Sequence, residues 1–344
     1  MSKKIHLVTG GSGFIGLNIV NKLLQQNRKV RVLDIYKSPD LHQSVEFYCC
    51  DINNDEGLKK ALKNVSYVHH NVALVPLAKA GNKFWKVNVE GTKLLLKYSK
   101  EMNIEFFSHM SSSAVFGLPD KMPITEKTKT KPIEIYGKAK FAGENLVFDE
   151  IKKGFNAAII RPRTVIGTQR LGIFQILFEW IHERRNIPII GKGDGLFQFV
   201  HVEDLAEVSI LACLEKKIGF FNIGTDDYGT LIGDLTYLCQ YANKKSKVIS
   251  LPVWLSIYSL KILDFLKLSP LGPWHYLTYH KPFYFDSSSA YKKLNWKPKW
   301  SNQKMLIESY DWYINNKKNK NSSEISLHKK PVKQKLLKLL KYFF

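Results

Sequence analysis

Short apolar runs alternate with longer segments of helical periodicity along the first half of the chain. The runs that predict strands are 5–9, 29–33, 45–48, 65–70, 104–110 and 157–161. Helical periodicity follows the first run and recurs over about 84–102 and 136–152. Strands that alternate with helices over this length predict a parallel sheet covered on both faces, which is a doubly wound α/β fold of Rossmann type.

The alternation loosens after about residue 166, and the remainder is mostly helical. Two short apolar runs, 198–202 and 219–223, are interpreted as returning strands that interleave with this remainder. We therefore expect a Rossmann domain over 1–166, a smaller substrate lobe over 167–314 and a C-terminal extension over 315–344.

A glycine-rich turn joins the first predicted strand to the first helix. Gly10 lets the chain turn sharply, Gly13 lets a pyrophosphate approach the backbone, and Gly16 lets the helix pack closely on the sheet. The N-terminus of that helix offers N–H groups to phosphate oxygens. The turn therefore predicts a dinucleotide site, and its place between strand and helix disfavours a turn without a ligand.

Asp34 ends the second predicted strand. A carboxylate there accepts hydrogen bonds from a ribose 2′-hydroxyl and repels a 2′-phosphate, which favours NAD over NADP. By alternation Arg31 faces away from Asp34, whereas Tyr36 and Lys37 follow it closely. Asp51, after the third strand, is placed to contact the adenine amino group, with an ordinary turn aspartate as the alternative.

Tyr136 and Lys140 are four residues apart on a predicted helix, so their side chains share one face. A free phenol has a pKa of about 10, and a lysine cation and an oxidised nicotinamide nearby lower it. Tyr136 can then take a proton from a carbinol while a hydride leaves the same carbon. Such a pair alone would favour a surface contact, but here it follows the glycine turn and the serine-rich segment 111–113.

Seven motifs carry a resemblance to the extended short-chain dehydrogenase/reductases of the NAD-dependent epimerase/dehydratase type. They lie at 9–16, 88–92, 111–117, 136–140, 161–167, 199–205 and 221–224. The resemblance covers about residues 4–314. It implies an NAD-dependent enzyme with a Rossmann domain and a small C-terminal substrate lobe.

The resemblance also implies roles for single residues. Tyr136 is the acid/base, Lys140 contacts the ribose and tunes the phenol, and Ser112 hydrogen-bonds the reacting oxygen. Ser112 is chosen over its neighbours because the family's hydroxyl lies four residues before the aromatic residue, here Phe116. Asn88 matches the residue that shapes the helix beneath the site, with a helix N-terminal cap as the alternative. No metal site is expected, and the expected cofactor contacts are Gly10, Gly13, Phe14, Ile15, Gly16, Asp34, Asp51, Ile52, Tyr136, Lys140 and Pro162.

Departures from the family pattern narrow the reaction. Sugar-nucleotide 4,6-dehydratases have Thr-Asp-Glu where residues 112–114 are Ser-Ser-Ala, which disfavours elimination of water. Sugar-nucleotide epimerases commonly have Asn at the position of Thr164 and Arg-Asp at 197–198, where this chain has Phe and Gln. A bidentate arginine at a diphosphate is therefore missing. The candidate replacements are Lys192, Arg163 and Arg170.

Three functions stay open from the sequence. The first is an epimerase or oxidoreductase acting on a nucleotide-linked or lipid-linked sugar, which we favour. The second is a dehydrogenase of a 3β-hydroxysteroid-like apolar alcohol, whose family members the segments 198–202 and 251–255 resemble. The third is a non-catalytic NAD-binding or RNA-associated protein, and the intact Ser112, Tyr136 and Lys140 argue against it. A homodimer is left open.

Length and composition agree with an intracellular globular enzyme. With 344 residues, 44% of them hydrophobic, the chain can bury one large core and a smaller lobe. Its four cysteines lack metal-ligand spacing and indicate no disulfide framework, and no signal peptide precedes the first strand, so we expect the cytoplasm. The longest apolar candidate, 251–268, contains Lys261, Asp264 and Lys267 and predicts no membrane span.

The net charge of +22 is high, and the segment 315–344 contributes nine lysines and one acidic residue to it. Residues 315–327 predict a flexible linker, and the residues after Pro331 predict a short basic amphipathic helix. Such a helix fits peripheral attachment to an anionic surface on the inner face of a membrane. A solvated tail is the alternative, and nucleic acid is not expected because the segment has no arginine.

Overall fold

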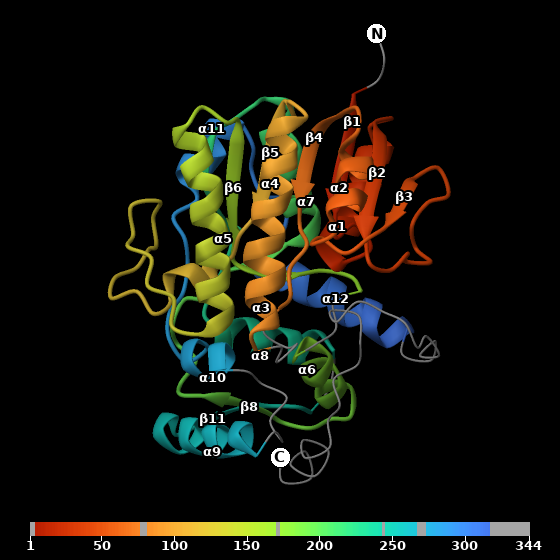
Figure 1. The fold of residues 1–344 in the computed structure, drawn as a ribbon. Helices are drawn as coiled ribbons and strands as arrows, with labels where there is room; N and C mark the ends of the chain where they lie inside the picture. Colours follow the sequence, from red (N-terminus) through yellow and green to blue (C-terminus); the bar gives the residue numbers. More distant parts are fainter. Residues whose placement is uncertain (1–3, 76–80, 170–172, 243–244, 267–272, 317–344) are drawn as a thin grey trace.

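The computed structural model describes residues 4–75, 81–169, 173–242, 245–266 and 273–316. Its largest element is a sheet of seven parallel strands in the order β10-β6-β5-β4-β1-β2-β3 (Figure 1). The strands are β1 Ile5–Thr9, β2 Lys29–Asp34, β3 Glu46–Cys49, β4 Val65–His70, β5 Phe106–Met110, β6 Ala157–Pro162 and β10 Gly219–Ile223. The predicted doubly wound parallel sheet is confirmed.

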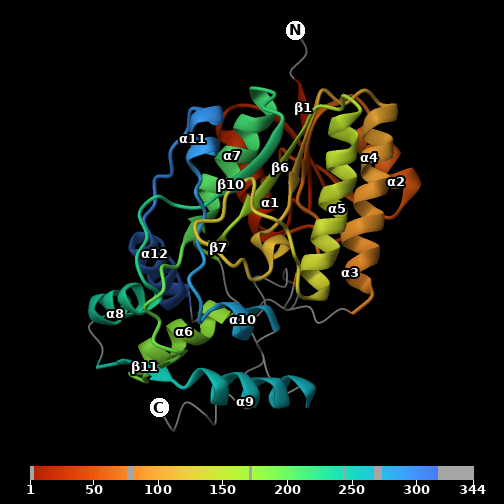
Figure 2. The same ribbon diagram turned by 90° about the vertical axis from the view of Figure 1, so that its left-hand side faces the viewer.

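Helices cover both faces of the sheet (Figures 1 and 2). On one face α1 Phe14–Gln25 packs against α7 Val202–Leu214. The other face carries α2 Asp55–Leu62, α4 Gly91–Glu101 and α5 Ile135–Lys152. Strands β5 and β6 are buried along their whole length, because helices shield them from both sides.

The predicted helix over 84–102 contains a change of helix type. It begins as the short α3 Lys83–Trp85, continues as a π-helical turn η2 Lys86–Glu90 and resumes as α4. Close packing fixes this region, since a Cβ on Gly91 would lie 2.6 Å from a methyl group of Ile52. A π-turn of this kind is frequent near functional sites.

The strand order reverses beside β1. The chain passes outward from β1 to β2 and β3 on one side, and through β4, β5, β6 and β10 on the other. This reversal leaves a crevice at the carboxyl ends of β1 and β4, which is where open α/β sheets bind ligands.

A smaller lobe lies beyond the carboxyl ends of these strands, in the lower half of Figure 1. Its helices are α6 Ile173–His182, α8 Leu231–Tyr241, α9 Val253–Phe265, α10 Pro273–Thr278 and α12 Asn302–Asn316, whereas α11 Ser288–Leu294 packs back beside β10. Two strand pairs complete it, β8 Ile187–Ile190 with β11 Val248–Leu251, and β7 Thr164–Ile166 with β9 Phe199–His201. The core of this lobe is rich in buried aromatic residues: Phe174, Phe178, Phe197, Phe199, Trp274, Phe283 and Phe285.

The two predicted returning strands pair differently. Residues 219–223 form β10 at the edge of the main sheet beside β6, as expected. Residues 199–201 form β9, which pairs with β7 in a separate sheet because β10 already occupies the edge beside β6. The side chain of Asn302 holds β9 by accepting a hydrogen bond from the Phe199 N–H at 3.0 Å. The division of the chain at residue 166 stays a prediction.

The C-terminal extension can be compared with the structure only at its start. Residues 315 and 316 end α12, and the predicted amphipathic helix after Pro331 lies outside the described residues. Among the residues that the structure describes, no helix has the length and hydrophobicity needed to cross a membrane.

Candidate active site

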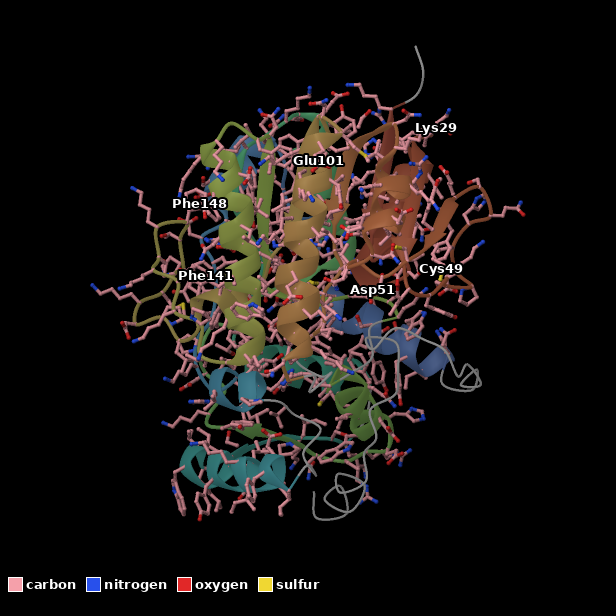
Figure 3. All side chains as sticks on the ribbon, in the orientation of Figure 1. Lys29, Cys49, Asp51, Glu101, Phe141 and Phe148 are labelled. Atoms are coloured by element: carbon pink, nitrogen blue, oxygen red, sulfur yellow. The ribbon has the colours of Figure 1, made fainter. Side chains whose placement is uncertain are left out.

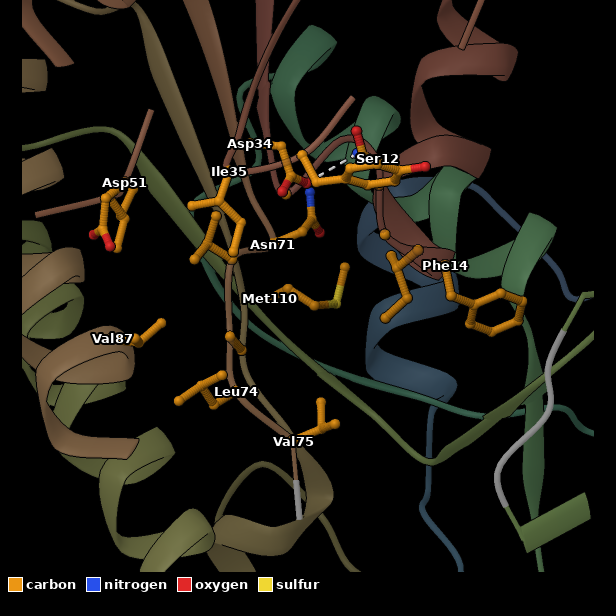
Figure 4. Close-up of a pocket in the computed structure, with 18 of the residues that line it drawn as sticks. Ser12, Phe14, Asp34, Ile35, Asp51, Asn71, Leu74, Val75, Val87 and Met110 are labelled. Carbon is orange, nitrogen blue, oxygen red and sulfur yellow. Dashed lines mark hydrogen bonds between the residues drawn. The ribbon is translucent and has the colours of Figure 1, made fainter. Parts of the chain in front are cut away.

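A cavity of about 580 Å³ lies at the reversal point of the sheet (Figure 4). Its walls come from the glycine turn after β1, the ends of β2, β4 and β5, and the first turns of α5. Figure 3 shows how densely side chains fill the rest of the fold, and Figure 4 shows Asp34, Asp51 and Met110 around the cavity. Of the predicted site residues, the lining includes Gly10, Gly13, Phe14, Ile15, Gly16, Asp34, Asp51, Ile52, Tyr136 and Lys140.

The glycine turn is held in the shape that its sequence predicts. Gly10 has a positive φ of 69°, and its N–H donates to the Leu33 carbonyl at 2.8 Å. A Cβ on Gly16 would lie 2.1 Å from the Gly10 carbonyl oxygen, so only glycine fits there. Within the described chain no side chain caps the start of α1, so the positive end of this helix faces the cavity, where an anion would be stabilised.

Asp34 lies at the end of β2 and reaches back to the glycine turn. Its Oδ2 accepts a hydrogen bond from the Ser12 N–H at 3.1 Å, drawn as a dashed line in Figure 4. Burial raises the pKa of this carboxyl, while backbone N–H groups, that of Ser12 first among them, oppose the rise. Arg31 points away, as predicted: it pairs with Glu46 at 2.8 Å and donates to two carbonyls near the end of α2.

Asp51 and Ile52 both line the far side of the cavity. Asp51 is exposed, and its Oδ1 accepts from the Asn53 N–H at 2.8 Å, so it also stabilises the turn before α2. Ile52 is buried against Gly91. Contact of Asp51 with an adenine ring stays a prediction.

The three serines after β5 have different partners. Ser111 Oγ donates to Glu144 Oε2 at 2.7 Å, and Ser113 Oγ accepts from Arg163 Nη1 at 3.1 Å. Ser112 Oγ accepts from the Ala114 N–H at 3.2 Å, and no acceptor for its own hydroxyl hydrogen occurs among the described residues. Of the three hydroxyl groups, that of Ser111 is committed as a donor, and Ser112 is less buried than Ser113. The lining nevertheless includes Ser111 and leaves Ser112 just outside.

Tyr136 reaches the cavity because α5 begins directly beside the serine segment. The Glu134 carboxylate caps this helix, accepting from the N–H groups of Tyr136 at 2.8 Å and Gly137 at 2.6 Å. A Cβ on Gly137 would lie 2.7 Å from the Ala114 carbonyl oxygen, so glycine permits the close approach. The Tyr136 ring also packs edge-on against Phe84, with ring centroids 6.1 Å apart.

Lys140 lies one helical turn after Tyr136 and is buried. Its Nζ donates to the Met110 carbonyl at 2.5 Å. Burial lowers the pKa of Lys140 to about 8, although the nearby Glu144 carboxylate opposes this effect. The ammonium group is therefore still charged at neutral pH, but it loses its proton at a pH only slightly above neutrality.

Sequence reasoning missed a buried ion pair beneath these residues. Glu144, one turn after Lys140, accepts two hydrogen bonds from Arg161 on β6, at Nε (3.0 Å) and Nη2 (2.5 Å). Both side chains are almost fully buried. With the bond from Ser111, this pair ties α5 to β5 and β6. Its signal in the sequence is an arginine within an apolar strand and a glutamate on the helix face of Lys140.

Asn88 and Pro162 lie outside the lining of the cavity. Asn88 is buried within η2, where its amide donates to the Leu74 carbonyl at 3.1 Å and accepts from the Leu74 N–H at 2.8 Å. It therefore fixes the segment after β4 and is not a helix N-terminal cap. Pro162 is the buried last residue of β6. The functional roles of both residues stay predictions.

The candidate replacements for the missing diphosphate arginine are placed differently. Arg163 is buried against the rings of Phe283 (4.2 Å) and Phe197 (5.0 Å), and among the described residues no carboxylate pairs with it. Burial lowers the pKa of Arg163 to about 9. Lys192 is exposed, and Arg170 lies outside the described residues.

Three comparisons with known proteins agree on the kind of protein. A family model described as "NAD dependent epimerase/dehydratase family" matches residues 6–224. An uncharacterized protein of Sinorhizobium fredii is 42% identical, covering 98% of this chain and 86% of its own length.

Two relatives of known activity are also similar to the chain. Mouse sterol-4-alpha-carboxylate 3-dehydrogenase is 30% identical, covering 77% of this chain and 76% of its own length. UDP-glucose 4-epimerase of Lactobacillus helveticus is 31% identical, covering 64% of this chain and 76% of its own length. Among solved structures, UDP-glucose 4-epimerase of Thermotoga maritima shares the fold, with a TM-score of 0.76 and 24% identity. The match covers 91% of this chain and 99% of that structure.

Proposed function

Because the chain belongs to the NAD dependent epimerase/dehydratase family, we propose that it transfers a hydride between a secondary alcohol and NAD, with Tyr136 as acid/base. Members of this family are enzymes of the extended short-chain dehydrogenase/reductase type, and NAD is the cofactor. One observation carries the assignment of residues. The same cavity is lined by the glycine turn and by Tyr136 and Lys140.

The residues around the cavity fit NAD. The start of α1 would hold the pyrophosphate through backbone N–H groups, in a turn that a Cβ on Gly16 would block. Asp34 would accept hydrogen bonds from the hydroxyls of the adenosine ribose. Lys140 would hold the ribose on the nicotinamide side. When bound, NAD supplies the acceptor and donor of the hydride.

Tyr136 moves the proton of the reaction. Its phenolate oxygen takes the proton from the substrate hydroxyl as the carbinol carbon is oxidised, and returns it when the carbonyl is reduced. The Ser112 hydroxyl donates to the reacting oxygen and orients it. The charge of Lys140 favours the phenolate form of Tyr136, and its bond to the Met110 carbonyl holds the ammonium in place.

A sugar carried by a nucleotide or a lipid is the substrate class that we favour. The epimerase description of the family and the Lactobacillus relative support it. Gln198 does not replace the missing arginine, because its amide is neutral and is committed to the Thr225 carbonyl and the Phe285 N–H. Arg163 donates to Ser113 Oγ at 3.1 Å and would contact an anionic part of the substrate.

An apolar alcohol of the 3β-hydroxysteroid type is the second candidate. The mouse relative supports it, since that protein is a dehydrogenase of a sterol. The resemblance of the segments 198–202 and 251–255 to family members of this kind also supports it.

We further propose a cytoplasmic enzyme with a peripheral position on the inner face of a membrane. The support is the charge of the segment 315–344, in which nine lysines face one acidic residue. Each lysine near an anionic surface contributes about 1 kcal/mol, and salt screens this contribution. Removing residues 321–344, which hold six of these lysines, should weaken binding to anionic vesicles at low salt.

One experiment tests the reaction and separates the two candidates. Purified protein is mixed anaerobically with NAD and each candidate substrate, and the absorbance of NADH is followed with product analysis. An epimerase keeps the hydride, so product forms without accumulation of NADH, whereas a dehydrogenase accumulates NADH. No turnover of any sugar or sterol alcohol would contradict the proposal.

A further inference from the structure

One helix of the substrate lobe exposes a strip of large hydrophobic side chains. On α9, the side chains of Trp254, Tyr258 and Phe265 are 74%, 64% and 86% exposed. Leu255, Ile262 and the adjoining Leu266 are exposed as well. These six make up nearly half of the fourteen large hydrophobic residues exposed in the described part of the chain. Single exposed apolar residues are ordinary, but a continuous strip marks an interaction surface.

The strip occupies one side of α9. Trp254, Tyr258, Ile262 and Phe265 recur at intervals of three and four residues, which places them on one helical face. The opposite side packs against β8 and α10, and Ser256 is buried there. Figure 2 shows α9 lying across the end of the lobe, far from the sheet, so the exposed side faces away from the molecule.

The composition of the strip favours a lipid surface. Tryptophan and tyrosine combine an apolar ring with a polar group and concentrate at the boundary between lipid and water. Lys261 is the charged residue at the exposed positions of α9, and Asp264 is only half exposed. Gly191 lies against Val253 and His280, which brings the exposed Lys192 and Lys281 close to the start of α9.

We infer that the exposed side of α9 docks on an anionic lipid bilayer, with the helix lying in the plane of the interface. A net charge of +22 complements such a surface. A second copy of the chain is a weaker occupant, because it would bring the same lysines close to one another. The docking face does not depend on the proposed hydride transfer, and it is distinct from the C-terminal segment.

Membrane binding through α9 and membrane binding through the segment 315–344 should respond differently to salt. Attraction between lysines and anionic headgroups is screened as salt rises. Contact between apolar side chains and acyl chains is not screened by salt. Vesicle binding through α9 therefore persists at about 0.5 M salt, where the Debye length is below about 8 Å.

The direct test uses the full chain and vesicles of phosphatidylcholine and phosphatidylglycerol with brominated acyl chains. The chain has seven tryptophans. The contribution of Trp254 is therefore taken as the difference between the unchanged protein and Trp254→Phe. We expect bromine to quench this difference signal on binding, since the indole enters the interface. No quenching of the difference signal at full binding would overturn the inference.

A second measurement compares sedimentation with vesicles at high salt. Phe265→Ser should weaken the partition by about 10-fold, because one large apolar side chain loses its contact with lipid. The matched control is Ile218→Ser, which removes an exposed apolar side chain beside β10 and should leave the partition unchanged. Circular dichroism checks that both variants fold.

Two further outcomes would also overturn the inference. If Phe265→Ser binds vesicles like the unchanged protein, α9 does not contact lipid. If the unchanged protein is a dimer in light scattering and Phe265→Ser makes it a monomer, a second copy covers α9. The activity assay with NAD is not involved, so failure here and failure of the proposed reaction are separate results.

Discussion

Replacing Glu144 with Gln should destabilise the protein strongly. Glu144 accepts hydrogen bonds from Arg161 at 2.5 and 3.0 Å and from Ser111 at 2.7 Å, and the side chains of the ion pair are 1% and 5% exposed. In Glu144→Gln an amide NH₂ takes the place of one carboxylate oxygen and faces an Arg161 N–H donor. The guanidinium then remains buried without a counter-charge. Breaking a buried pair in this way costs about 3–5 kcal/mol.

The assay is urea unfolding followed by circular dichroism, with the free energy of unfolding obtained by linear extrapolation. The control is Asp149→Asn, which removes an exposed carboxylate from the same helix, where Lys152 contacts it at 2.9 Å. An exposed pair of this kind contributes at most about 1 kcal/mol. The double variant Glu144→Met with Arg161→Met should recover much of the loss, because it removes both charges of the buried pair together.

A second readout connects this pair with the proposed chemistry. The Glu144 carboxylate opposes the fall in the pKa of Lys140, so Glu144→Gln should move that pKa below about 8. Lys140 then loses its proton at lower pH, and NAD binding should weaken from a lower pH upward. Equal unfolding free energies for Glu144→Gln and Asp149→Asn would refute the reasoning.

Three other predictions concern the binding of cofactor and substrate. NAD should bind at least about 10-fold more tightly than NADP (about 1.4 kcal/mol), and Asp34→Ala should narrow this gap in calorimetric titrations; equal affinities in the unchanged protein would contradict the role of Asp34. Affinity for NAD should fall as pH rises through about 8, the pKa of Lys140. Lys140→Arg should move this fall to higher pH, and an unchanged pH profile would show that the lysine does not control NAD binding. Arg163→Met should raise KM for an anionic substrate with little loss of unfolding free energy, since no described carboxylate pairs with Arg163; a loss of stability without a change in KM would make the residue structural.

The sequence predicted those parts of the site that depend on local patterns. Alternation of apolar runs and helices determines the parallel sheet, and the glycines of the turn at Gly10–Gly16 are required by backbone geometry that neighbouring residues impose. Tyr136 and Lys140 share a face because four residues nearly complete one helical turn. Their place in the cavity follows from the start of α5, which the Glu134 cap and Gly137 determine.

Features that depend on distant segments could not be predicted. Glu144, Arg161 and Ser111 come from a helix and two strands, and no local spacing reveals that they meet. The exposed strip of α9 was equally hidden, because the apolar sequence of 251–268 is as compatible with a buried helix as with one that faces outward. The bond between Asn88 and Leu74 required the π-helical turn, which the periodicity of 84–102 did not indicate.

The central claim is that Tyr136 moves the proton in a hydride transfer that uses NAD. Tyr136→Phe removes the transferable proton and keeps the ring that packs against Phe84. The decisive measurement is turnover of the best substrate by Tyr136→Phe and by the unchanged protein, with NAD affinity measured in parallel. Turnover should fall by about 10²-fold or more while NAD affinity and the unfolding free energy stay near their original values. Turnover close to that of the unchanged protein would contradict the account.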